Sequence, residues 1–224
     1  MSARSHRSRL SMPTRSRRKG GAGRMVCILL VAVLVVDQAL KFWVKTHMYY
    51  GEDIEIFSWW HIRFIENNGM AFGWQFISKY LLTAFRLVAI VLIFIYLINL
   101  VRQRQRTFIL VCVTLILAGA IGNVIDCLFY GLLFNSPRPP MVAQWVGWGE
   151  GYAPLMLGRV VDMLYFPLLE WDMPGWSWLD SVPFLPGAGE HCIFFSPIFN
   201  VADAAVSCGI IALLIYFLLP SRRR

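Results

Sequence analysis

Four long apolar stretches constrain the fold of this chain more than any other feature of its sequence. They cover residues 25–45, 80–101, 108–130 and 197–219. An α-helix rises about 1.5 Å per residue, so about 20 apolar residues are enough to cross the roughly 30 Å hydrocarbon core of a bilayer. Of the 224 residues, 58% are hydrophobic and only 15% are charged, which is typical of polytopic membrane proteins. We therefore expect an all-α membrane protein with four transmembrane helices that form one domain, residues 25–219.

Basic residues indicate how these helices cross the membrane. Fourteen of the 21 lysines and arginines lie in residues 1–24, 102–106 and 220–224, and none of the 13 acidic residues does. Because positive charge marks cytoplasmic segments, both termini are predicted to be cytoplasmic, as a basic tail and a basic end. Residues 46–79 and 131–196 are then outside. The same topology, with attraction to anionic lipid, explains the net charge of +8, and we expect no nucleic-acid partner.

The two outer segments differ in composition. The first contains DIEIFSWWHIRFIENN, in which apolar and polar residues alternate, and this pattern predicts a small extracytoplasmic β element of one or two short strands, which can pair as a hairpin on the membrane surface. The second is long, and residues 132–197 hold nine of the 11 prolines and five of the nine tryptophans. This composition is typical of an irregular segment at the membrane interface, and it leaves open whether the segment is a lid or a spacer.

Three aspartates fall inside the apolar stretches, where an ionisable side chain costs about 3 kcal/mol. Counted from the cytoplasmic ends, Asp37 lies about 18 Å and Asp126 about 27 Å up their helices, and Asp203 lies about 9 Å below the outer end of its helix. All three therefore converge on the outer half of the bilayer. Asp162, in GRVVDMLYF, is predicted to re-enter the same layer. Lys41, four residues after Asp37, has the spacing of a structural ion pair.

Asparagines accompany two of these acids at a spacing of three residues. Asn123 precedes Asp126 in GNVID, and Asn200 precedes Asp203 in FNVAD. In a helix this spacing places each amide on the same face as its acid, where it can hold the carboxylate or a nearby peptide carbonyl. For Asn200, a helix N-cap is an equally good explanation. Asp126 meets the unfavourable end of the helix dipole and needs another partner.

This gathering of carboxylates allows hydrolytic chemistry. Two carboxylates held close together do not both ionise easily, so one keeps a proton while the other acts as a base toward a shared water. That arrangement hydrolyses a peptide bond without a metal or a covalent intermediate. Two alternatives use similar acids: a proton-coupled transporter, and a magnesium-dependent enzyme acting on phospholipid head groups. The five cysteines and four histidines show no metal-binding spacing, so no metal site and no cofactor is expected.

Five motifs in order along the chain resemble those of bacterial lipoprotein signal peptidase, also called signal peptidase II. They read VVDQALKFWVK, ENNGMAFGW, GAIGNVIDCLFYG, GRVVDMLYF and FNVADAAVSCG. The resemblance implies an aspartic endopeptidase of the bacterial inner membrane whose active site faces the outer leaflet. Its substrates would be prolipoproteins with a diacylglyceryl-cysteine, cut on the amino side of that cysteine. Membrane phospholipid is then a second partner, and we expect a monomer.

The family's functional positions transfer residue by residue onto these motifs. The resemblance assigns the catalytic pair to Asp162 and Asp203. It also assigns supporting roles to a set of polar and small residues: Asp37, Lys41, Asn67, Gly69, Ala71, Gly122, Asn123, Asp126 and Asn200. The family commonly has an arginine directly after the aspartate of the third motif, where this chain has Cys127. Arg159, three residues before Asp162, is a candidate substitute for that arginine.

Overall fold

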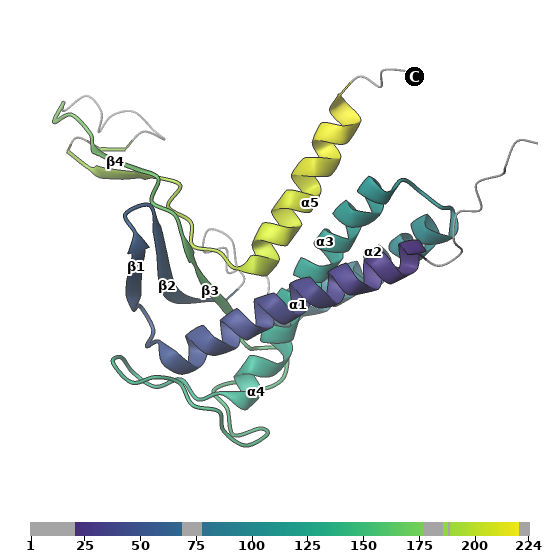
Figure 1. Cartoon of the computed structure of the whole chain (residues 1–224). Coiled ribbons are helices and arrows are strands. Elements are labelled where there is room, and N and C mark those ends of the chain that lie inside the picture. The colour runs from purple at the N-terminus through teal and green to yellow at the C-terminus, as the bar shows by residue number, and fades with distance from the viewer. Residues whose placement is uncertain (1–20, 69–77, 177–185, 188, 220–224) are drawn as a thin grey trace, which may run out of the picture.

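The computed structural model describes residues 21–68, 78–176, 186–187 and 189–219. Four helices among these residues are long and apolar enough to cross a membrane, as expected (Figure 1). The basic tail up to residue 20 and the end from residue 220 lie outside the described residues, as do Gly69 and Ala71.

The observed helices extend the expected stretches by a few residues or shorten them. The third span continues past its α-helix through a π-helical turn and a last short turn. The helices are α1 (Gly21–His47), α2 (Lys79–Arg102), α3 (Thr107–Ile125), η2 (Asp126–Tyr130), α4 (Gly131–Leu133) and α5 (Val201–Leu218).

Two small antiparallel sheets accompany the helices. The predicted hairpin is confirmed as β1 (Asp53–Phe57) and β2 (Trp60–Asn67), and β3 (Val160–Tyr165) pairs with β2 to complete a three-stranded sheet. A separate ribbon, β4 (Leu169–Asp172) with β5 (His191–Phe194), extends beyond that sheet (Figure 1). The prediction of an irregular second outer segment is therefore wrong for these three strands. Residues of β3 become a strand because β2, about 95 residues earlier, presents a free edge to them.

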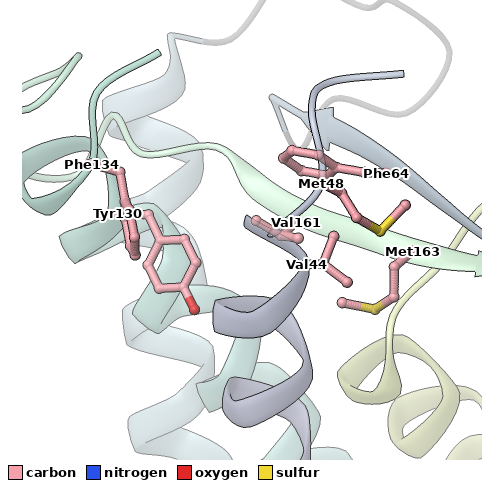
Figure 2. Close-up of a cluster of buried hydrophobic side chains, with 7 residues drawn as sticks. All are labelled: Val44, Met48, Phe64, Tyr130, Phe134, Val161 and Met163. Carbon is pink, nitrogen blue, oxygen red and sulfur yellow. The ribbon is translucent and has the colours of Figure 1, made fainter. Parts of the chain in front are cut away.

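A hydrophobic cluster fixes the three-stranded sheet to the helices. It joins the end of α1, the strands β2 and β3, and the η2–α4 region (Figure 2). Burying one such side chain contributes about 1.5–3 kcal/mol, so the cluster is a strong attachment. Its buried members are Val44, Met48, Phe64, Tyr130, Phe134, Val161 and Met163.

Helix α3 is the central helix of the bundle. Half of its apolar window is buried, compared with 11–17% in the other three spans. A Cβ on Gly119 would overlap the carbonyl oxygen of Ala202 in α5, and a Cβ on Gly122 would lie 2.7 Å from Oδ2 of Asp37 in α1. Gly119 therefore lets the backbone of α5 approach α3 closely, and Gly122 leaves room against α3 for the carboxylate of Asp37.

Helix α5 begins later than the apolar stretch predicts, at Val201 rather than residue 197. The residue before its cap, Phe199, is extended and exchanges backbone hydrogen bonds with Leu164 of β3, at 2.7 and 3.0 Å. Asp203 therefore lies in the first turn of α5 and not deep within a helix. This strand-like entry brings the start of α5 against the strand that contains Asp162.

Candidate active site

Asp162 lies in β3 and is almost completely buried, with 2% of its surface exposed. It comes to the site on a strand of the three-stranded sheet. The side-chain amide of Asn200, at the start of α5, donates a 2.6 Å hydrogen bond to Oδ1 of Asp162. Asn67, from the neighbouring strand, is a second hydrogen-bond partner of this carboxyl. Two supporting residues predicted from the motifs therefore contact Asp162.

Asp203 is held by an asparagine from another helix. The Nδ2 of Asn123 in α3 donates to Oδ1 of Asp203 at 2.7 Å. Asn200 Nδ2 also donates to Oδ1 of Asn123 at 3.1 Å, so two amides in series join the carboxyl of Asp162 to that of Asp203. The expectation that Asn123 holds Asp126, its neighbour in the motif, is wrong, because its amide reaches across to α5 instead.

Asn200 is the N-cap of α5 that its sequence position suggests, but its side-chain amide donates to Asp162 and Asn123 and not to the carboxylate of Asp203. As the cap, Oδ1 of Asn200 accepts a 2.9 Å hydrogen bond from the backbone N–H of Asp203. In return, the carboxylate of Asp203 accepts a 3.4 Å hydrogen bond from the backbone N–H of Asn200. The cap does not use Nδ2 of Asn200, which donates to Asp162. The cap thus orients the amide toward Asp162.

Lys41 of α1 has no exposed surface and lies at the centre of a cluster of polar side chains, the Lys41 cluster. Its ammonium group lies 2.8 Å from Oδ2 of Asp126, 3.0 Å from Oδ2 of Asp37 and 2.9 Å from Oδ1 of Asn123. The three N–H donors of the lysine therefore have three acceptors. The expected Asp37–Lys41 pair is present, and Lys41 is the partner that Asp126 required.

Asp37 and Asp126 each hold the backbone of a second element. Oδ1 of Asp37 accepts a 2.8 Å hydrogen bond from the N–H of Ala202, in the first turn of α5. Oδ2 of Asp126 accepts a 3.2 Å hydrogen bond from the N–H of Val161, the residue before Asp162. The Lys41 cluster thus positions the two segments that contain Asp162 and Asp203.

Gln38 of α1 is a further polar residue of the site, one that was not predicted from the sequence. Its Nε2 lies 3.1 Å from Oδ2 of Asp37 and 3.0 Å from Oδ1 of Asp126, and it accepts a 3.3 Å hydrogen bond from the hydroxyl of Tyr130. A glutamine beside an aspartate within an apolar stretch is the signal that would have found it.

The position occupied by Cys127 has an arginine beside it, but not the expected one. Nη1 of Arg86, in α2, donates to the sulfur of Cys127 at 3.3 Å. Arg159 instead pairs with Glu66 at 3.0 Å, so its proposed role as a substitute is wrong. A lone arginine inside the second apolar stretch was the available signal for Arg86, because a cation there requires polar surroundings.

The surroundings of Asp162 raise the pKa of its carboxyl to about 7. Burial is the largest cause, and the negative charge of Asp203 adds to it. Hydrogen bonds from Asn200 and Asn67 and the charge of Lys41 act in the opposite direction. Asp162 therefore keeps a proton over part of the neutral range, as one member of a coupled carboxylate pair must.

Membrane-spanning helices thus surround a polar cluster in which two amides join two carboxyl groups, the kind of side chains that metal-free peptide hydrolysis uses. Comparison with known proteins identifies the class of enzyme as a membrane protease and gives its family. Residues 29–219 match the family described as signal peptidase (SPase) II, and the chain belongs to this family.

Curated relatives agree with this assignment. A lipoprotein signal peptidase from Porphyromonas gingivalis is 45% identical over 196 residues, which cover 87% of this chain and 83% of the relative. Another from Amoebophilus asiaticus is 38% identical over 192 residues, covering 82% and 72%. A solved bacterial membrane enzyme shares the fold, with a TM-score of 0.56 at 23% identity over 88% of this chain and 95% of that one. Family membership sets aside the transporter and head-group enzyme alternatives.

Proposed function

We propose that this chain removes the signal peptide from diacylglyceryl-modified prolipoproteins, with Asp162 and Asp203 as the pair that activates water. Its family supports the removal of signal peptides from prolipoproteins. The observation that supports the residue assignment is the pair of amides, Asn200 and Asn123, that joins the two carboxyl groups. Such a link holds two acids from different elements at one place, as water-mediated hydrolysis requires.

In the proposed reaction Asp203 is the base and Asp162 is the acid. The carboxylate of Asp203 takes a proton from water as the water oxygen bonds to the carbonyl carbon on the amino side of the lipidated cysteine. Protonated Asp162 donates its proton to the carbonyl oxygen. In the resulting tetrahedral intermediate, the carbon–nitrogen bond breaks as Asp203 passes its proton to the leaving amine, and the re-forming carbonyl returns a proton to Asp162. Both carboxyl groups end as they began, and no cofactor is consumed.

Residues around the pair have positioning roles in this proposal. Lys41 neutralises Asp37 and Asp126, and these two acids fix the backbones of α5 and β3. Gly122 leaves the space that Asp37 fills, which adding a methyl group there would remove. Arg86, beside Cys127, places its guanidinium at the position where the family commonly has an arginine.

We further propose that the site faces the outer leaflet of the bacterial inner membrane. Arg102 ends α2, and Arg104 and Arg106 lie between α2 and α3, at the ends of these helices remote from the sheet; basic residues mark the cytoplasmic side. With these arginines on the cytoplasmic side, the proposal has both termini inside and the sheet outside. Residues 25–219 act as one membrane peptidase domain, functioning as a monomer, between basic segments at residues 1–24 and 220–224.

Cleavage is expected to be insensitive to metal chelators. Asp37 and Asp126, the clustered carboxylates that would attract a divalent cation, are already paired with the ammonium of Lys41. The purified protein should therefore release the signal peptide from a diacylglyceryl-modified prolipoprotein equally well with and without EDTA, as measured by gel shift. A loss of turnover that added magnesium restores would refute a metal-free mechanism, and cleavage of an unlipidated prolipoprotein at the same rate would refute the substrate class.

Cleavage is expected to slow as the pH rises through about 7, because the proton of Asp162 is lost above its raised pKa. The same shift affects stability. Between pH 3.8 and about 7 the folded protein holds a proton that the unfolded chain has released, so this stabilising contribution is lost as the pH rises across that range. Initial cleavage rates at saturating substrate across this pH range provide the test. A rate that continues to rise above pH 7 would show that Asp162 is not the acid.

A further inference from the structure

The strands β2 and β3 present a second polar group on the face away from Asp162. Glu66 of β2 lies opposite Val161 of β3 in the sheet register, and paired residues project to the same face. Val161 and Met163 point into the hydrophobic cluster with α1 (Figure 2), whereas Asp162 contacts Asn200 on the other side. Glu66 is therefore behind the proposed catalytic strand, on the side toward the end of α1.

Glu66 is shared by two cations. Its carboxylate pairs with Lys45 of α1 and, at 3.0 Å, with Nη1 of Arg159. The side chains of Lys45 and Glu66 are only 2% and 4% exposed. The ring of Tyr152 lies 5.0 Å from the ammonium of Lys45 and 5.0 Å from the guanidinium carbon of Arg159. One carboxylate thus compensates two positive charges that are held close together.

A cavity of about 220 Å³ opens at this ion group. Its lining includes Lys45, Glu66 and Arg159, together with Arg138 and Ser136 from the loop after α4. Three cationic side chains and one carboxylate line it, which leaves a formal excess of two positive charges. The cavity has room for a tetrahedral anion and several further atoms.

The donors at this cavity are only partly used. A lysine ammonium has three N–H donors, and among the described contacts Lys45 donates one, to Glu66. Arg159 uses Nη1 for Glu66 and Ser136, which leaves Nη2 and Nε of its guanidinium. An anion with several oxygen acceptors satisfies these donors and neutralises the excess charge.

The depth of the cavity in the membrane indicates which kind of anion binds there. Lys45 is the third residue from the end of α1, where the chain leaves the span and enters the sheet, so the cavity lies at the level of the lipid head groups. We propose that this cavity binds the phosphate of an anionic phospholipid such as phosphatidylglycerol, and that the bound lipid fixes β2 and β3 from behind Asp162. Basic pockets at the ends of transmembrane helices bind anionic head groups in this way.

A lipid titration tests the proposal. Short-chain phosphatidylglycerol is added to the full chain in a neutral detergent, and binding is followed by tryptophan fluorescence, with short-chain phosphatidylcholine and inorganic phosphate in parallel. We expect saturable binding of phosphatidylglycerol and much weaker binding of the other two. Arg138→Gln, at an exposed loop position, is expected to raise the dissociation constant about fivefold, the effect of removing one cation near an anionic head group.

Arg63→Gln is the matched control, because Arg63 is an exposed arginine of the same sheet and is outside the cavity lining. The proposal is overturned if phosphatidylglycerol and phosphatidylcholine bind equally, or if Arg63→Gln weakens binding as much as Arg138→Gln. Inorganic phosphate binding as tightly as the lipid would indicate a site for free anions, and displacement of the lipid by an acidic peptide would indicate a peptide site. The readout is binding, so these outcomes are independent of the proposed catalytic pair.

Discussion

Replacing Asp203 with asparagine is expected to abolish detectable prolipoprotein cleavage, and replacing Asp162 with asparagine should do the same. General acid–base catalysis by one side chain contributes up to about 10⁴-fold, and an amide neither takes a proton from water nor donates one to a carbonyl oxygen at neutral pH. Asparagine preserves the size of each side chain, so the protein should remain folded. Cleavage of a diacylglyceryl-modified prolipoprotein in membranes, together with the unfolding temperature of each variant, provides the measurement.

The double variant supplies a further test of the pair. Because the two acids act in one proton transfer sequence, removing both should cost no more than removing either alone. Asp53→Asn is a suitable control, since Asp53 is an exposed carboxylate of the same sheet that pairs with His61 at 2.9 Å. Near-normal turnover by either single variant would refute the assignment of the pair.

Replacing Lys41 with methionine is expected to destabilise the protein by about 3–5 kcal/mol. The substitution removes the cation that neutralises Asp37 and Asp126, which are 1% and 0% exposed, and leaves two buried carboxylates facing each other. Thermal unfolding in detergent, followed by tryptophan fluorescence, should show a large decrease in midpoint. The rate of cleavage should also fall, because Lys41 donates to the side-chain oxygen of Asn123 and the side-chain nitrogen of Asn123 donates to Asp203.

A further variant separates the effect of unpaired charge on the stability of Lys41→Met from the effect of lost packing. Adding Asp37→Asn and Asp126→Asn to Lys41→Met removes the unpaired charges, and this triple variant should recover part of the lost stability. Lys79→Met is the matched control, since the ammonium of Lys79 donates to the exposed amide of Asn68, at 3.2 Å. A triple variant less stable than Lys41→Met alone would show that charge burial is not the reason. Asp37→Asn alone is expected mainly to reduce stability, with a smaller effect on turnover.

Much of the fold was predictable from hydropathy and alternation, but β3 was not. The apolar run around Asp162 is so short that its pattern is compatible with a strand or with a helix. Pairing with β2 resolved that ambiguity. The start of α5 was misplaced for a related reason, since Phe199 is as apolar as the helix that follows but is held extended by Leu164.

The candidate site was also predictable only in part. The motifs pointed to Asp162, Asp203 and their asparagines, yet the spacing rule paired Asn123 with the wrong acid. A hydrogen bond depends on two atoms lying about 3 Å apart, and neighbours in a motif have no advantage over atoms brought in from another element. Arg86 was missed and Arg159 misassigned for this reason, because both lie far from Cys127 in sequence and only helix packing decides which one reaches it.

The sequence by itself determined the four membrane-crossing helices and the hairpin. It also determined that several acids lie within apolar stretches, where they need polar partners. These properties follow from the length and local periodicity of short segments. The tertiary structure alone decided which groups meet. Asn200 reaches Asp162 across 38 positions, and Asp37 holds the backbone of Ala202 across 165. Gly119 leaves room for the backbone of α5 and Gly122 for the carboxylate of Asp37, so α1 and α5 both contact α3 beside the ion group of Lys41, Asp37 and Asp126.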